Sequence, residues 1–169
     1  TVGITQEYVV PSRSSQAKVS RTTTDSVTVN KDGSRTEQTS IIDNNYDAVG
    51  RLIASRGRTS GVSYDAYYTG PADDVYRSFF ETTQIFGIYH GQSKISSQTT
   101  HSWSKSRDLI DSHQYVTVTY SYNGSGQVTG AIGEGYGNTV DSFGNVTNSD
   151  IEQIFAVING QAKMTLSSS

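Results

Sequence analysis

The chain contains no cysteine, only two prolines, one methionine and one tryptophan in 169 residues. The lack of cysteine excludes disulfide frameworks, thiolate zinc sites and cysteine nucleophiles. Charged residues are also scarce at 17%, the net charge is −3, and lysine and arginine form no cluster. Because a nucleic-acid backbone is normally bound by a basic face, we expect no nucleic-acid partner. No apolar run approaches the roughly 18 residues that a membrane helix needs, so we also expect no membrane span.

Strand-forming residues are abundant. Roughly a quarter of the chain is Ser or Thr, and Val, Ile and Tyr are frequent while Leu is rare. The 11 Tyr and 5 Phe are more than a disordered chain carries, and 16 Gly suit a fold with many tight turns. The composition therefore predicts an all-β fold. Because the chain opens at Thr1 without a methionine, we expect it to be a processed or excised part of a larger polypeptide.

Three segments of the chain resemble one another, which indicates an internal repeat. They are TQEYVVPSRSSQAKVSRTTT (5–24), TTQIFGIYHGQSKISSQTT (82–100) and IEQIFAVINGQAKMTLSSS (151–169). The last two lie 69 residues apart, and the first two lie 76 apart when aligned on their Gln-Ala-Lys or Gln-Ser-Lys step. We call these segments the QAK hairpins, because each contains two alternating strand-like runs.

The turns of the QAK hairpins predict their register. Asn159-Gly160 is a strong signal for a two-residue hairpin turn, and His90-Gly91 occupies the same place in the second copy, whereas the first has a longer loop at 11–14. The expected cross-strand pairs are Phe155 with Met164, Val157 with Ala162, Phe86 with Ile95, Ile88 with Ser93, Tyr8 with Val19, and Val10 with Ala17. Lys18, Lys94 and Lys163 are expected on the opposite face.

A helix is the alternative for the first half of the third copy. Ile151, Ile154, Phe155 and Ile158 have helical spacing. The equivalent stretches contain Pro11 in the first copy and a mid-run glycine in the second, and repeats should share one structure. Strands are therefore favoured.

A second motif lies between the QAK hairpins. Its clearest form is YDAVGRL (46–52), with looser versions at 122–128, 140–146 and 29–35. Asp or Asn starts a turn by bonding its own backbone, and the following Gly takes the left-handed conformation. We call the elements around these turns the YD-like hairpins and expect them at 27–60 and 115–148. Alternation of apolar and polar residues over 116–122 predicts a half-buried strand that leads into one such turn.

YDAVGRL and DSFGNVT (141–147) resemble the signature of YD repeats of the RHS type. In that family such repeats form long, curling antiparallel sheets in secreted toxins, toxin-enclosing shells and cell-surface adhesion proteins. The resemblance implies a secreted or cell-surface protein. It carries no functional residues to this chain, because the signature residues are structural turn formers.

The expected architecture is a series of antiparallel hairpins, with about twelve strands in a curved sheet, a flattened barrel or a solenoid-like array. Residues 61–81 and 104–112 are the least strand-like parts, and a helical turn is expected near Asp73. The glycine-rich stretch 130–137 matches no phosphate-binding motif, and we expect a flexible turn or a bulge there.

No motif for chemistry stands out. His90 fits a turn position, and His101 and His113 flank Trp103 without metal-ligand spacing, so we expect no metal and no cofactor. Asp73 and Asp74 are adjacent, which does not suit the facing carboxylates of a glycosidase. No catalytic residue is therefore assigned.

We expect a non-catalytic structural or adhesive repeat segment that forms a filament or shell, with neighbouring repeats or identical subunits pairing through the sheet edges. One alternative is a carbohydrate-binding module, and a more distant one is a glycan hydrolase that uses Asp73 or Asp74. In the carbohydrate-binding alternative, the aromatic contacts for glycans are Tyr64, Tyr67, Tyr68, Tyr76 and Trp103.

Overall fold

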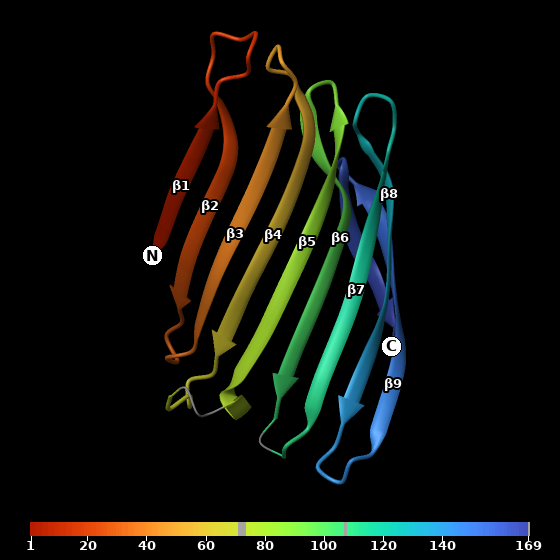
Figure 1. The fold of residues 1–169 in the computed structure, drawn as a ribbon. Helices are drawn as coiled ribbons and strands as arrows, with labels where there is room; N and C mark the ends of the chain where they lie inside the picture. Colours follow the sequence, from red (N-terminus) through yellow and green to blue (C-terminus); the bar gives the residue numbers. More distant parts are fainter. Residues whose placement is uncertain (71–73, 107, 169) are drawn as a thin grey trace.

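A computed structural model describes residues 1–70, 74–106 and 108–168. Over these residues the chain forms one open antiparallel sheet of ten strands, in which each strand pairs with its neighbours in sequence (Figure 1). The strands are β1 (Val2–Val9), β2 (Lys18–Val29), β3 (Arg35–Tyr46), β4 (Leu52–Tyr64), β5 (Arg77–Tyr89), β6 (Gln92–Lys105), β7 (Asp111–Tyr122), β8 (Val128–Val140), β9 (Val146–Ile158) and β10 (Gln161–Ser168). The prediction of an all-β fold of antiparallel hairpins is confirmed, with ten strands where about twelve were expected.

The QAK hairpins have the predicted turns. Asn159 and Gly160 have φ values of 52° and 74°, and His90 and Gly91 have 49° and 78°, as a two-residue hairpin turn requires. The predicted pairs Phe155–Met164, Phe86–Ile95 and Tyr8–Val19 are all present. Strand β9 covers the stretch for which a helix was the alternative.

Each QAK hairpin also contains a bulge at the same place. The pairing skips Ser20 in β2, Ser96 in β6 and Thr165 in β10. The Ser96 hydroxyl donates to the Ile85 carbonyl at 3.0 Å, and the Thr165 hydroxyl donates to the Ile154 carbonyl at 3.1 Å. Because a bulge bends its strand and increases the local twist, we expect the second strand of each hairpin to bend at the same place.

Three of the four YD-like turns close through one side-chain oxygen. Asp47, Asn123 and Asp141 each accept hydrogen bonds from the backbone amides two and four residues later, at 2.8–3.0 Å. The glycine three residues on has a positive φ of 86°, 75° or 84°, as predicted. The turn that joins β6 to β7 has the same backbone bonds, but Leu109 takes the glycine position with a φ of 59°.

The two faces of the sheet differ in chemistry, because paired residues share a face and successive residues alternate. We name them after Trp103 and Ser55, which point to opposite sides. At the end of the sheet near the β2–β3 turn, one row on the Ser55 face consists only of hydroxyl residues from eight successive strands. These are Thr28, Thr36, Ser63, Ser78, Ser104, Ser112, Thr139 and Thr147.

The expected turn or bulge at 130–137 is wrong, because this stretch lies inside β8 and pairs with strands on both sides. Its glycines serve close packing. A Cβ at Gly133 would lie 2.7 Å from the Gln153 side chain, and one at Gly137 would lie 2.7 Å from the Ser149 hydroxyl. Glycine in a strand often marks such a close approach. Gly57, which lies 76 residues before Gly133, approaches a glutamine in the same way, since a Cβ there would lie 2.7 Å from the Gln84 side chain.

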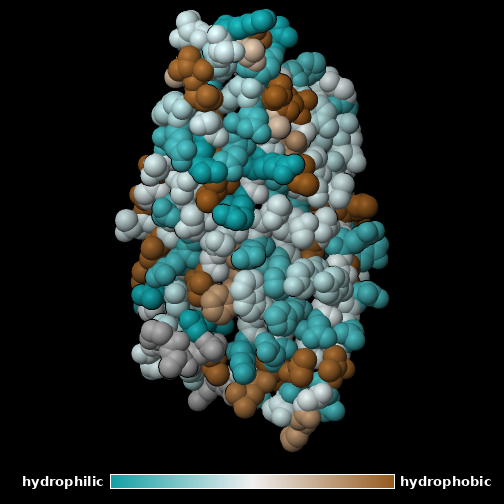
Figure 2. All heavy atoms as spheres, viewed as in Figure 1, coloured by the Kyte–Doolittle hydropathy of each residue, from teal (hydrophilic) through white to brown (hydrophobic). Residues whose placement is uncertain are grey.

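The sheet has no second layer of secondary structure among the described residues. Among the residues that the structure describes, the buried hydrophobic side chains are those of Ala131 and Ile151, at 8% and 5% exposure. Figure 2 shows hydrophobic atoms in scattered patches between polar ones on the face in view. Among the residues described, the structure contains no helix that is long and apolar enough to cross a membrane.

Candidate functional site

A column of stacked rings crosses the Trp103 face. Phe79 in β5 and Trp103 in β6 have ring centroids 5.2 Å apart and planes within 9°. His101 lies 4.6 Å from Trp103 along the same strand and 3.9 Å from Tyr115 in β7. Tyr115 in turn stacks on Tyr136 in β8 at 4.9 Å. We call these five residues the aromatic column.

The register of the sheet places these rings side by side. Phe79 pairs with Trp103, His101 with Tyr115, and Tyr115 with Tyr136. Directly paired residues on one face have Cβ atoms about 4.5–5.5 Å apart, which is the distance at which aromatic rings stack. The column therefore follows from strand pairing and needs no additional element to support it.

Two imidazoles meet within this arrangement. His101 Nε2 lies 3.3 Å from His113 Nδ1, and the two rings are stacked with centroids 5.6 Å apart. Burial lowers the pKa of His101, and the nearby His113 lowers it further, whereas Glu81 acts in the opposite direction. The neutral form of His101 is thus the one that the folded sheet favours.

A second ring cluster extends the column toward the connection between β4 and β5. The Tyr64 and Tyr68 rings are 4.7 Å apart, and the Arg35 guanidinium lies 4.4 Å from the centroid of the Tyr64 ring. The Arg77 guanidinium is 5.8 Å from the Tyr68 ring and 5.3 Å from the ring of Phe79. Through these cation–π contacts, rings and guanidinium groups form a continuous chain from β3 to β8.

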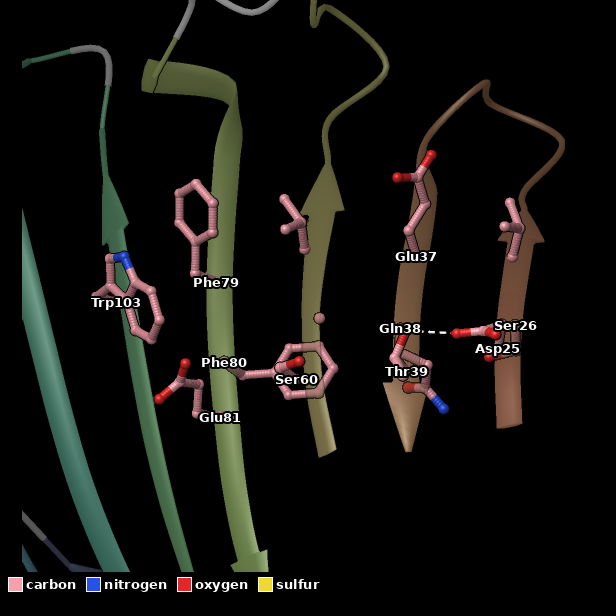
Figure 3. Close-up of a pocket in the computed structure, with 13 residues that line it drawn as sticks. Asp25, Ser26, Glu37, Gln38, Thr39, Ser60, Phe79, Phe80, Glu81 and Trp103 are labelled. Carbon is pink, nitrogen blue, oxygen red and sulfur yellow. Dashed lines mark hydrogen bonds between the residues drawn. The ribbon is translucent and has the colours of Figure 1, made fainter. Parts of the chain in front are cut away.

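An open groove of about 450 Å³ lies next to Phe79 and Trp103 (Figure 3). Its apolar part also includes Val27 and Val62. Its polar residues include three carboxylates, and two of these have partners, since Thr39 donates to Asp25 at 2.6 Å and Arg35 lies 3.4 Å from Glu37. The third carboxylate, Glu81, is exposed.

The described side chains of the groove do not form a metal site. In the part of the chain that the structure describes, no group of three or more His, Asp or Glu side chains could hold a metal ion. The expected helical turn is a short 3₁₀ helix, η1 (Asp74–Tyr76), which leads into β5. Asp73, one of the two carboxylates of the hydrolase alternative, lies outside the described residues.

The structure places the aromatic residues that the sequence singled out in three groups, and Arg77 links the first of these to the group of Trp103. Tyr64 and Tyr68 lie together, Tyr67 lies 6.2 Å from the Tyr76 ring in a second pair, and Trp103 belongs to the aromatic column. Sequence reasoning missed the other members of the column. The sequence signal that could have found them is the similarity of His101-x-Trp103 to His113-x-Tyr115. These two patterns pair with each other across the β6–β7 turn.

Comparison of the chain with protein-family models, curated proteins and solved structures finds no match.

Proposed function

We propose that the chain is a non-catalytic structural segment of a larger, repeat-built protein, in which it forms part of a continuous single-layer sheet. The observation that carries the proposal is that the outer strands β1 and β10 each pair on one side only and are almost wholly exposed. The accessible surface is 10913 Å², whereas a folded monomer of this mass would expose roughly 8,100 Å². The excess of roughly 2,800 Å² is several times the roughly 800 Å² that one partner buries in a standard protein interface.

The internal repeat supports the same proposal. Repeat units that cannot bury a core alone are stabilised by stacking against their neighbours. Here all three QAK hairpins share a bulge, and three of the YD-like turns share one hydrogen-bonding pattern. The resemblance of these turns to YD repeats supports the further proposal that the parent protein is secreted or displayed at a cell surface.

The geometry of the aromatic column favours a structural role for Trp103 over glycan binding. A sugar binds an aromatic platform through an open ring face. The Trp103 ring is stacked on Phe79 and has the His101 ring close by. Rings packed in this way stabilise neighbouring strands, by about 0.5–1.5 kcal/mol for each pair. Tyr67, at 74% exposure, is more accessible, but it lies in the connection between β4 and β5 and pairs with Tyr76, which is not a member of the column.

The open edge of β1 provides a direct test. Thr1 and Val27 exchange two backbone hydrogen bonds at 2.8 Å, so odd-numbered residues of β1 bond toward β2. Even-numbered residues therefore direct their N–H and C=O groups away from the sheet. Ile4→Pro would block this edge without removing a bond to β2, whereas the control Thr5→Pro would remove one.

We expect the unmodified chain to associate reversibly as its concentration rises, because unpaired edges pair with one another. Sedimentation velocity over a range of concentrations would measure this, and Ile4→Pro should reduce the associated fraction while the far-ultraviolet spectrum stays β-rich. A chain that stays strictly monomeric at high concentration would contradict the proposal.

A further inference from the structure

The inner strands of the sheet show how strands equivalent to the two edge strands, β1 and β10, are paired on both sides. Strand β10 corresponds to β2 and β6, the second strands of the other two QAK hairpins, and these pair with β3 and β7. Strand β1 corresponds to β5 and β9, which pair with β4 and β8. Inside the sheet, each QAK hairpin therefore pairs only with YD-like hairpins. The first strand of a YD-like hairpin pairs with the second strand of a QAK hairpin, and the second strand of a YD-like hairpin pairs with the first strand of the next QAK hairpin.

A tyrosine hydroxyl marks the contact on the first-strand side. Tyr46, at the end of β3, donates to the Val19 carbonyl of β2 at 3.0 Å. Tyr122, at the end of β7, donates to the Ile95 carbonyl of β6 at 2.7 Å. Both tyrosines immediately precede the Asp or Asn that starts a YD-like turn. Burial raises the pKa of Tyr122, which keeps its hydroxyl protonated as a donor.

The third QAK hairpin contains the equivalent acceptor. Val19 pairs with Tyr8 and Ile95 pairs with Phe86, and in β10 the residue at this place is Met164, which pairs with Phe155. In a two-residue hairpin the residues that flank the turn form the hydrogen-bonded pair. The backbone groups of Ala162 and Met164 therefore point away from β9, toward the open side of β10.

We propose that the open edge of β10 binds the first strand of a YD-like hairpin, whose tyrosine donates its hydroxyl to the Met164 carbonyl. The inference rests on the proposed structural function and specifies the partner. The edge of β1 binds the second strand of a hairpin of the same kind. Direct pairing of β10 with β1 of a second copy would place two QAK hairpins side by side, an arrangement that the described strands nowhere contain.

The test is to supply the missing hairpin in register. Since Met164 corresponds to Ile95, residue 169 corresponds to residue 100, and a copy of residues 101–145 is appended directly after it. The controls are an appended segment of shuffled sequence and the extended chain with Tyr122→Phe in the appended copy. The measurement is amide hydrogen exchange at Ser167, which corresponds to Gln98, the β6 residue that pairs with Val118 of β7, together with sedimentation velocity.

With the native extension we expect exchange at the Ser167 amide to slow by about tenfold or more relative to the shuffled extension. The tyrosine change in the appended copy should restore roughly fivefold faster exchange, because one hydrogen bond is lost. Equal exchange with native and shuffled extensions would overturn the inference. If the unextended chain still associates through its edges in that case, the proposed function stands and only the identity of the partner is wrong.

Discussion

Replacement of Trp103 by alanine tests whether the aromatic column stabilises the sheet. Trp103 lies near the middle of the column, stacked on Phe79 at 5.2 Å and close to His101 at 4.6 Å. Alanine removes both ring contacts and leaves the backbone pairing of β6 intact. Trp103→Phe is the matched variant, because it keeps a ring in the same place.

The expected loss follows from burial and ring pairing. Truncation of a buried Phe or Trp to Ala costs about 3–5 kcal/mol. Trp103 is only partly buried, so we expect about 2–3 kcal/mol, of which its two ring pairs contribute about 0.5–1.5 kcal/mol each. Trp103→Phe should cost about 1 kcal/mol, because it retains most of the stacking.

Urea unfolding followed by far-ultraviolet circular dichroism measures these losses as shifts of the midpoint. Trp103 is the single tryptophan of the chain, so its fluorescence in the unmodified protein reports the column alone. Tyr67→Ala is the control, since Tyr67 is 74% exposed and its loss should cost no more than about 0.5 kcal/mol. If Trp103→Ala costs no more than this control and abolishes glycan binding instead, the column is a binding surface and the structural argument is refuted.

Three further changes test particular contacts. Gly61→Ala should cost about 2 kcal/mol in urea unfolding, because the Phe80 ring occupies the place of the new Cβ, whereas Gly130→Ala meets nothing within 4 Å and should be nearly neutral. Because burial and a neighbouring imidazole lower the pKa of His101 below its ordinary 6.5, the unfolded chain binds more protons. The urea midpoint should therefore fall as pH drops from 7.5 through 6.5, and His101→Gln should flatten this dependence. Leu109→Gly should raise the unfolding free energy by about 1 kcal/mol. The Leu109 backbone is left-handed, with a φ of 59°, which glycine adopts without strain, and the Leu109 side chain is exposed, so its removal costs little.

The sequence predicts those parts of the fold that depend on local conformation. Asn159-Gly160 and the turn that begins at Asp47 require positive φ values, and the residues that accept such values are visible in the sequence. Once a two-residue turn is placed, the pairing of its flanking strands follows by counting. The register of Phe155 with Met164 was therefore predictable.

The aromatic column was not predictable in the same way. It depends on the turn that joins β6 to β7, where Leu109 takes the position at which the other turns have glycine. Because the sequence does not reveal that turn, counting residues from it does not predict that His101 pairs with Tyr115. The glycines of β8 were misread for a related reason, since a glycine that makes room for Gln153 looks in the sequence like one that makes a turn.

The distribution of contacts along the sheet explains why its ends need neighbours. The chain of ring and guanidinium contacts begins at Arg35 in β3 and ends at Tyr136 in β8, so it does not include the outer strands. All residues of β1 are exposed, and most of β10 is exposed as well. In a single layer each strand is stabilised mainly by the strands beside it, and an end strand has one such neighbour instead of two. Local opening therefore costs least at β1 and β10. These are the two places where a YD-like hairpin would add the missing pairing.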